Sequence, residues 1–326
     1  MEFFHSVNVD WLGKKWYFLA FSMIFSVAGL ISMGWQYAHI GSPVPLGVDF
    51  RGGTAVTVQF AEPPNLNRIR QAIDAAGIKD FDISAFGEAS GHQVLISLPE
   101  QMNEKALDVG RAEVESALRS HYSANFTVRS VEVVGPTVGH QLEKQAALAT
   151  LYSLIGMLIY LWFRFQLIYG VAAVIACFHD TLITIGAFSL ASLFGFNGLE
   201  LSLTVIAAIL TLVGYSMNDT IVVFDRIREN LRLSRREPLP ALVNRSINQT
   251  LSRTVLTSGL TFLTVLSLFI FGGQVLKGFS FALVVGILIG TYSSIAVASP
   301  MLVAWQEWRA KKGRAMALPA AKRGRS

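Results

Sequence analysis

A histidine and an aspartate stand next to each other inside a long apolar stretch of the sequence. His179 and Asp180 lie near the middle of Leu167–Phe194, which otherwise holds mostly apolar and small residues. An ionisable side chain costs about 2.5–3.5 kcal/mol at the centre of a membrane-spanning helix, so it normally faces a protein interior or a wet cavity. The pair predicts either a proton relay or a buried polar contact that fixes helix packing, and the residues leave both open.

A second polar group interrupts the apolar stretch Leu199–Phe224. Ser216, Asp219 and Thr220 are spaced i, i+3 and i+4, so they share one face of a helix, and Asn218 lies between them. This stripe predicts that Asp219 is a proton-responsive group, with Ser216 and Asn218 as candidate relay or packing residues. The alternative is that Asp219, near one end of the stretch, reaches back to the membrane interface.

Arg253 is the third candidate, at the start of the apolar stretch Thr254–Phe271. An arginine at a membrane interface is ordinary by itself. However, consecutive spans run in opposite directions, so Asp219 and Arg253 are expected at similar depth from the same face. In a close pair the positive charge keeps Asp219 ionised, and when the pair separates Asp219 becomes easier to protonate. The two residues together therefore predict a proton switch.

No motif for nucleotide hydrolysis or covalent catalysis occurs in the sequence, which lacks a P-loop, an HExxH motif and a GxSxG motif. His92 and His121 have no second histidine or cysteine at metal-ligand spacing, and Cys177 is the only cysteine, so no intramolecular disulfide forms. We therefore expect no enzyme, no cofactor and no metal. An ion gradient is the expected energy source, since one charge crossing a membrane is worth about 2.3 kcal/mol per 100 mV.

Long apolar stretches must position these groups. The chain of 326 residues is 52% hydrophobic and only 15% charged, whereas soluble domains have about 25% charged residues. A membrane-spanning helix needs roughly 20 mostly apolar residues. The sequence predicts six such helices, at Trp16–Tyr37, Ala146–Phe163, Leu167–Phe194, Leu199–Phe224, Thr254–Phe271 and Phe279–Trp305.

The basic residues follow the predicted spans and set the orientation. They gather in 1–15, in the link 225–253 and in the tail 306–326, whereas the short links on the other side hold only Lys277. The positive-inside rule then predicts cytoplasmic termini, an external (periplasmic) segment 38–144 and a five-helix bundle at 146–305. All six tryptophans lie at predicted span boundaries. Because the charge follows topology instead of one folded face, nucleic-acid binding is not expected.

The external segment alternates strand-like and helix-like patterns. Strands are predicted at Val48–Phe60, Asp82–Phe86, Gln93–Leu98 and Phe126–Val134, and helices at Asn65–Ala76 and Glu104–His121. The order β-α-β-β-α-β predicts a ferredoxin-like domain with a four-stranded antiparallel sheet. Its edge strands offer a binding surface for an extended chain, and a structural cap or a docking module for a partner is the open alternative.

Small residues and one short segment complete the sequence-based expectations. Gly286 and Gly290 form a small-xxx-small pair that favours close helix contact, and Pro300 is expected to kink the sixth span. Leu239–Leu251 is amphipathic and is predicted to lie on the cytoplasmic surface, with Leu242, Val243 and Ile247 towards lipid.

Several of these motifs resemble those of the SecD/SecF family of protein-export membrane proteins. Gly47–Thr54 is similar to the family signature GxDFxGGT, in which Asp49, Gly52 and Gly53 are the structural motif residues. Gly214–Asn230 resembles the family's fourth-span motif almost letter for letter. The pair His179-Asp180, the segment Arg253–Ser258 and the segment Gly290–Pro300 resemble the third-, fifth- and sixth-span motifs.

The resemblance implies a function in protein export. It implies an α-helical polytopic membrane protein of six transmembrane helices, an RND-type half bundle, with a ferredoxin-like α+β periplasmic domain. It also implies SecD as an obligate partner, contact with the SecYEG channel, YajC and translocating preproteins, and use of the proton motive force in late, SecA-independent translocation across the inner membrane. Asp219 and Arg253 match the family positions linked to proton transport.

Two alternatives remain beside this interpretation. The chain can be a subunit of another RND-type exporter that moves lipids or small molecules, because such proteins share the span pattern and an intramembrane acid. It can also be a passive scaffold of a complex. The joint presence of the fourth-span motif and the GxDFxGGT strand favours protein export over the first, and substitution of Asp219 distinguishes the second.

Overall fold

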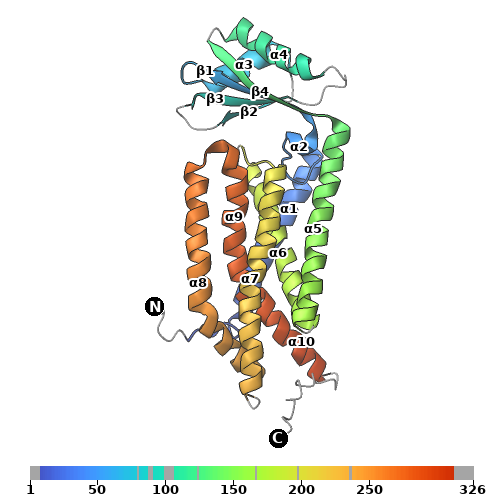
Figure 1. The fold of residues 1–326 in the computed structure, drawn as a ribbon, viewed down its shortest axis with the longest axis vertical. Coiled ribbons are helices and arrows are strands. Elements are labelled where there is room, and N and C mark those ends of the chain that lie inside the picture. The colour runs from blue at the N-terminus through green and yellow to red at the C-terminus, as the bar shows by residue number, and fades with distance from the viewer. Residues whose placement is uncertain are drawn as a thin grey trace.

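Six long apolar helices form one bundle, and a small α+β domain sits on one end of it (Figure 1). The computed structural model describes residues 8–78, 81–86, 91–98, 106–122, 125–165, 167–196, 198–234 and 237–311. The first five long helices are α1 (Lys15–Ile40), α5 (Pro136–Arg164), α6 (Leu167–Leu193), α7 (Leu203–Leu233) and α8 (Leu239–Phe271). The sixth crosses as α9 (Gly273–Ser293), a π-helical turn (Ser294–Ala298) and α10 (Ser299–Lys311). The chain is therefore a multi-pass membrane protein, as its sequence predicts.

The helices bury their small and polar residues and turn their apolar residues outward. Helix α1 is the clearest case, because its apolar side chains Met23, Ile24 and Ile31 are each about two-thirds exposed. The residues it buries are Ser22, Ser26, Gly29, Ser32 and Gln36. This inverted pattern suits a helix that faces hydrocarbon on one side and packs closely on the other.

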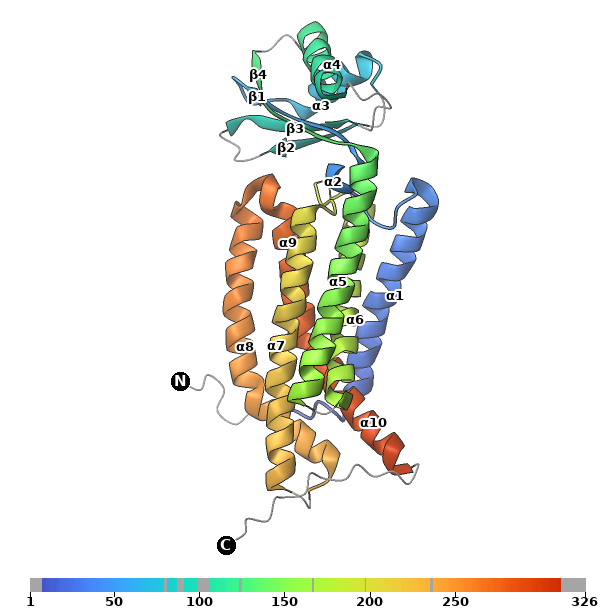
Figure 2. The same ribbon diagram turned by 45° about the vertical axis from the view of Figure 1, so that its right-hand side comes forward.

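Close backbone contacts hold the bundle together at glycines. A Cβ atom on Gly186 of α6 would lie 2.9 Å from the Cα of Gly29 in α1, so only glycine allows these helices their separation. The predicted pair in the sixth span also packs closely, because a Cβ on Gly290 would lie 2.9 Å from the Cβ of Ser216 in α7. Helix α9 therefore lies directly against the polar face of α7 (Figure 2).

The expected irregularity near Pro300 takes the form of a π-helical turn at Ser294–Ala298, immediately before the proline. Proline has no N–H and crowds the preceding turn, so a local widening of the helix accommodates it. The Ser299 hydroxyl donates to the Ser294 carbonyl at 2.9 Å and stabilises this turn. Helix α10 then leaves the bundle obliquely (Figure 2).

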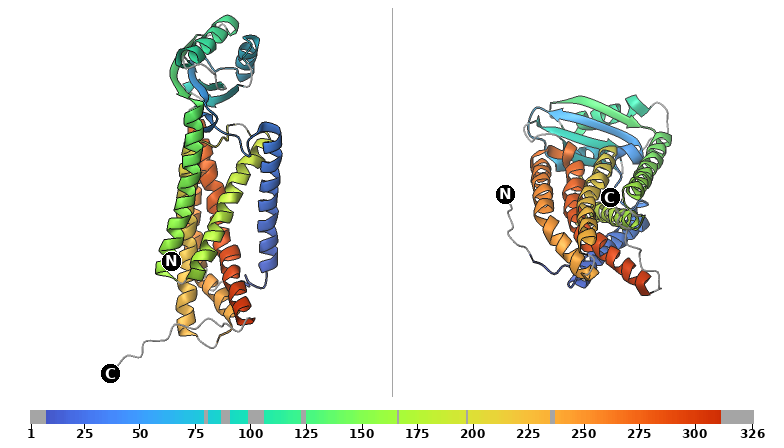
Figure 3. Two further views of the ribbon diagram at one scale, coloured as in Figure 1. Left: turned by 90° about the vertical axis from the view of Figure 1, so that its right-hand side faces the viewer. Right: turned by 60° about the horizontal axis from the view of Figure 1, so that its bottom comes forward.

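The α+β domain has the predicted element order and an all-antiparallel sheet. Its elements are β1 (Gly53–Phe60), α3 (Leu66–Ala75), β2 (Asp82–Phe86), β3 (Gln93–Leu98), α4 (Ala106–His121) and β4 (Phe126–Val134). The strand order β2-β3-β1-β4 makes β2 and β4 the edge strands. Both helices cover one sheet face, and Figure 3 shows the domain stacked on the bundle. The fold is ferredoxin-like, as predicted.

One predicted element is wrong in part, and one is described only in part. Val48–Phe60 is not one strand, because Val48–Arg51 forms the short helix α2 and β1 begins only at Gly53. Gly52 and Gly53 have φ values of 76° and 124°, which end α2 and turn the chain into the sheet. The predicted helix Glu104–His121 begins at Ala106 in the structure, and its first two residues lie outside the described part of the chain.

The segment Leu239–Leu251 is also different from the prediction. It is the first part of α8 and continues without a break into the fifth span. Leu242, Val243 and Ile247 are fully buried in the protein instead of facing lipid. They pack in the same core as Leu12 and Leu302 and close the end of the bundle away from the α+β domain. Periodicity identified the apolar face correctly but could not say what covers it.

Candidate functional site

The predicted acidic group of α7 is buried between helices. Asp219 is 2% exposed, and its carboxylate accepts a hydrogen bond of 2.6 Å from the Ser258 hydroxyl on α8. Ser216 and Thr220 lie on the same face of α7 and are each 1% exposed. The polar stripe therefore faces the bundle interior, and Asp219 does not reach back to the membrane interface. Its burial makes the ionised form depend on donors and positive charge supplied by the protein.

Asn218 is placed differently from its neighbours in the stripe. It is exposed on the outer side of α7, away from Asp219 and Ser216. An amide on the outer face of a membrane-spanning helix needs a polar partner, because hydrocarbon offers none. The two clusters of hydrogen bonds described here do not include it.

Asp180 is the centre of a second buried cluster. It is 0% exposed, and its Oδ2 atom accepts hydrogen bonds from the hydroxyls of Ser216 at 2.6 Å and Ser293 at 2.7 Å. Its Oδ1 atom lies 3.1 Å from Nδ1 of His179, and Nε2 of His179 contacts the Ser22 hydroxyl. One carboxylate thus joins residues of α1, α6, α7 and α9. Such a hydrogen-bonded network joins the four helices and helps to fix their packing.

Ser216 connects the two clusters. Its hydroxyl donates to Asp180, and it lies one turn before Asp219 on the same face of α7. The hydrogen bonds of the two carboxylates nevertheless end on different partners, Ser258 for Asp219 and Ser216 and Ser293 for Asp180. The structure therefore brings both sequence-predicted acids to the polar face of α7, Asp180 from α6 and Asp219 from α7 itself, with their hydrogen bonds ending on different partners.

Arg253 is exposed on α8, five residues before Ser258. Its charge acts on Asp219, but the hydrogen-bond partner of the Asp219 carboxylate among the described side chains is Ser258 and not Arg253. The arrangement corresponds to the separated state of the expected pair. In the sequence, Ser258 is noticeable only as the last residue of Arg253–Ser258, the segment that resembles the fifth-span motif of the family. Its spacing of i+5 from Arg253 gave no indication that it would be the direct donor.

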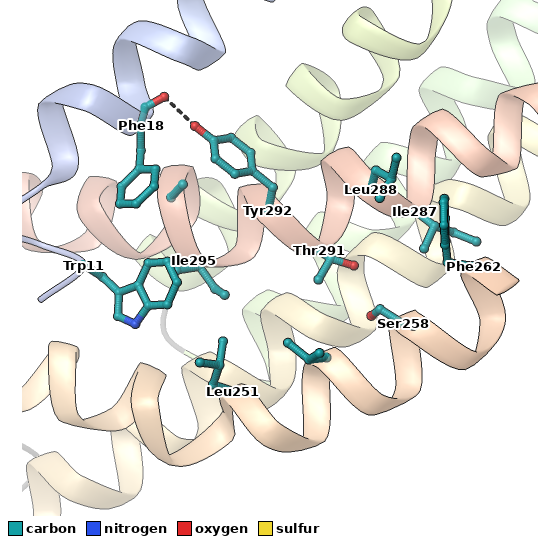
Figure 4. A pocket seen from close by; sticks show the side chains of 13 residues that line it. Trp11, Phe18, Leu251, Ser258, Phe262, Ile287, Leu288, Thr291, Tyr292 and Ile295 are labelled. Atoms are coloured by element: carbon teal, nitrogen blue, oxygen red, sulfur yellow. Dashed lines mark hydrogen bonds between the residues drawn. The ribbon is translucent and has the colours of Figure 1, made fainter. Parts of the chain in front are cut away.

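An apolar pocket of about 340 Å³ opens beside Asp219 (Figure 4). Ser258 and Thr291 lie on its wall, so the hydroxyl that binds Asp219 belongs to the same wall. Trp11 and Phe18 close the pocket at one end, and the Tyr292 hydroxyl donates to the Phe18 carbonyl. Ser258 thus stands between the buried Asp219 carboxylate and this partly open, apolar space.

The predicted structural motif at the start of the α+β domain anchors the domain to the bundle. The Asp49 carboxylate accepts a 2.9 Å hydrogen bond from the Leu203 N–H at the beginning of α7, where helix N–H groups lack partners. Gly47 donates to the Leu201 carbonyl at 2.9 Å. A Cβ on Gly139 of α5 would lie 2.8 Å from the Phe50 carbonyl oxygen, so α2 also packs closely against α5.

A metal site is not indicated by this geometry. Within the described ranges, no group of three or more histidine, cysteine, aspartate or glutamate side chains is arranged to hold an ion. The two buried acids each have hydroxyl donors, which satisfy a carboxylate directly. Hydrogen bonding and proton exchange are therefore the chemistry that these residues provide.

Family models and curated relatives agree with the motifs. Residues 113–308 match the model for the C-terminal region of the protein export membrane proteins SecD/SecF, and residues 40–64 match the SecD/SecF GG motif. A protein translocase subunit SecF from Koribacter versatilis is 53% identical over 98% of this chain and 96% of its own length. One from Desulfurispirillum indicum is 43% identical over 91% of this chain and 92% of its own length.

A solved structure shares the fold. The crystal structure of SecDF, a translocon-associated membrane protein from Thermus thermophilus, matches with a TM-score of 0.77 and 38% identity, over 93% of this chain. The chain spans only 39% of that protein. The six-helix RND-type half bundle with a ferredoxin-like domain predicted from the sequence is therefore confirmed. The chain belongs to the SecD/SecF family of protein-export membrane proteins, as a SecF-type subunit of that protein translocase.

Proposed function

We propose that the chain pairs with SecD and uses the proton motive force to drive late, SecA-independent stages of preprotein translocation across the inner membrane. The observation that carries this proposal is the buried Asp219, whose carboxylate accepts a hydrogen bond from a hydroxyl on a different helix. A carboxylate held in this way changes its proton occupancy when α7 and α8 shift relative to each other. That property couples a gradient to helix movement without a nucleotide.

The proposed cycle has two states of the pair Asp219 and Arg253. When Arg253 approaches, its positive charge holds Asp219 ionised, and Ser258 donates to the remaining carboxylate oxygen. When Arg253 withdraws, the buried carboxylate takes up a proton from the connected wet side. Asp180, His179 and Ser216 provide a second proton-exchanging cluster that the α7 stripe links to Asp219.

The partner SecD is supported by the outer surface of the bundle. Asn218 is a polar residue on the outward face of a membrane-spanning helix, which a second half bundle would satisfy. Helix α8 is mostly unburied along its apolar length in this chain alone. SecYEG, YajC and translocating preproteins are further proposed contacts. Co-purification from native membranes tests the set, with SecD expected in stoichiometric amount; absence of SecD would contradict the proposal.

We propose an inner-membrane location with both termini in the cytoplasm. Basic residues gather at the end of the bundle away from the α+β domain, at the start of α1, in the adjoining ends of α7 and α8 and in α10, as the positive-inside rule requires for a cytoplasmic face. The remainder of the basic tail, Lys312–Ser326, lies outside the described residues. In a Cys177→Ser background, a cysteine at the exposed Ser130 should react with an impermeant reagent only from the periplasm. Labelling from the cytoplasmic side would contradict this topology.

A further inference from the structure

The α+β domain contacts the bundle at a third place besides its two covalent joints. The chain enters the domain through α2 into β1 and leaves it from β4 into α5. The edge strand β2 lies two strands away from β1, faces the bundle and contacts α9 (Figure 1). The link between α6 and α7 lies at the same end of the bundle. Movement of the domain about its joints therefore requires β2 to separate from the bundle.

Two carboxyl groups meet at this contact. Asp82 is the first residue of β2, and Glu200 lies in the link between α6 and α7. The two side chains interact electrostatically. Both line a small cavity of about 30 Å³, with Arg51 of α2 and Ser97 of β3. Two carboxyl groups can form a direct hydrogen bond only when one of them carries a proton, because two carboxylates are acceptors only.

The surroundings of Glu200 favour its protonated form. Burial, and after it the neighbouring Asp82, raise the pKa of Glu200 to about 7 against the opposing charge of Arg51. The nearby Asp49 carboxylate is engaged by the Leu203 N–H. On α9, Lys277 precedes Gly278, which packs against the Glu200 carbonyl. These are the charged groups on the elements around Glu200.

We propose that Asp82 and Glu200 form a proton-binding site that holds the α+β domain on the bundle when the pair shares a proton and releases the domain when the proton is lost. The proposal does not depend on proton transport through Asp219, because the site lies outside the membrane-spanning helices and joins different elements. Its ligand is a proton from the compartment that the α+β domain faces. Protonation on that side would thus control the position of a domain that contacts translocating chains.

The direction of the pH effect follows from linkage. Separation of β2 from the bundle exposes Glu200 to water and returns its pKa towards the ordinary 4.5. The docked state therefore binds more protons than the separated state. The proton stabilises docking fully below about pH 4.5. This stabilisation decreases as the pH rises towards about 7 and is lost above that pH. Each unit of pKa difference changes the ratio of docked to separated molecules about tenfold.

The glycines at the joints permit this movement. Gly52 and Gly53 have positive φ values between α2 and β1. Gly135, between β4 and α5, would have nothing within 4 Å of an added Cβ atom. The anchors on the bundle side, including the hydrogen bond from Leu203 to Asp49, lie before these glycines and need not break.

The test measures the position of the domain in the full chain in lipid nanodiscs. In a Cys177→Ser background, spin labels at Ala85→Cys on β2 and Leu260→Cys on α8 report the distance between domain and bundle by pulsed electron paramagnetic resonance. We expect one short distance at low pH and a growing population at longer distance as the pH is raised through the window from about 4.5 to about 7.

Variants separate the proposed site from a general pH effect. Glu200→Gln keeps the shape and can donate to Asp82, so it should hold the short distance at every pH; Asp82→Asn should do the same from the other side. Glu132→Gln removes an exposed carboxylate on β4 of the same domain and should respond as the wild type does. A wild-type distance that does not change with pH, or a Glu200→Gln variant that keeps the full pH response, would overturn the proposal.

Discussion

The α+β domain and the helical bundle differ in how many polar residues they place in their interiors. The domain buries Val56, Ile96 and Leu118 completely, as a water-soluble fold does. The bundle also buries apolar side chains such as Leu212 and Phe224, but it adds two aspartates and many serines and threonines to its interior and exposes many large apolar side chains. The difference follows from the solvent of each region. In hydrocarbon, burial of an apolar side chain gains little, so helices associate through close contact of small residues and through hydrogen bonds.

The largest effect on stability is expected from a core substitution in the α+β domain. Ile96→Ala removes a fully buried side chain on β3 and should destabilise the domain by about 2–5 kcal/mol. Ile24→Ala, on the outer face of α1 where the side chain is 65% exposed, should cost far less in a membrane. Hydrogen–deuterium exchange of the full chain in nanodiscs measures both. If both substitutions destabilise their regions equally, the proposed difference between the interior of the domain and the outer face of the bundle is wrong.

A smaller but clear effect is expected from a glycine at a helix contact. Gly186→Ala forces α6 away from α1, since the new Cβ would lie 2.9 Å from Gly29 Cα. Overpacking of this kind costs about 1–3 kcal/mol. Gly156→Ala in α5 has open space around the added atom and serves as the matched control. The thermal midpoint in detergent should fall only for Gly186→Ala, and an unchanged midpoint would mean that the helices adjust freely.

Removal of the direct donor to Asp219 should weaken function and leave assembly intact. Ser258→Ala deletes a 2.6 Å hydrogen bond to a buried carboxylate, an interaction worth about 1.5–3 kcal/mol. We expect a partial loss of gradient-driven export in reconstituted vesicles. Ser267→Ala, on the exposed side of the same helix and bonded only to its own turn, is the control. A loss as large in the control would point to general damage of α8.

The smallest functional effect is expected for Arg253→Lys. Lysine keeps the positive charge but lacks the planar, multiply donating guanidinium group, so the contacting state with Asp219 should form less precisely. Export driven by the gradient should be reduced but measurable, whereas Arg253→Gln should lose it. If both variants export as the wild type does, Arg253 serves only the membrane interface.

Sequence patterns predicted most of the fold because each region repeats a simple period. Six long apolar stretches and one β-α-β-β-α-β order were sufficient for the bundle and the domain. Two features of the fold depend on tertiary contacts and cannot be seen in a local sequence pattern. One is the helix Val48–Arg51, which ends at two glycines with positive φ, and the other is the burial of Leu242 in a closed core.

The acids of the candidate site and the donor Ser216 were predicted from the sequence, but the other donors were not. Asp180 and Asp219 are conspicuous because charges are rare in apolar stretches. Ser258, Ser293 and Ser22 are common small residues, and only the packing of four helices shows that they bind the acids or their histidine neighbour. The carboxyl pair Asp82 and Glu200 joins positions far apart in the sequence, so the sequence alone contains no signal for it.

The central claim, that Asp219 couples the proton gradient to export, is tested most directly by Asp219→Asn. Asparagine keeps the size and can still bond Ser258, but it carries no titratable proton. The measurement is preprotein translocation into vesicles that contain the variant with SecD and SecYEG, with and without an imposed proton gradient. We expect normal assembly and no stimulation by the gradient. Stimulation as large as in the wild type would contradict the account and leave Asp180 as the next residue to test.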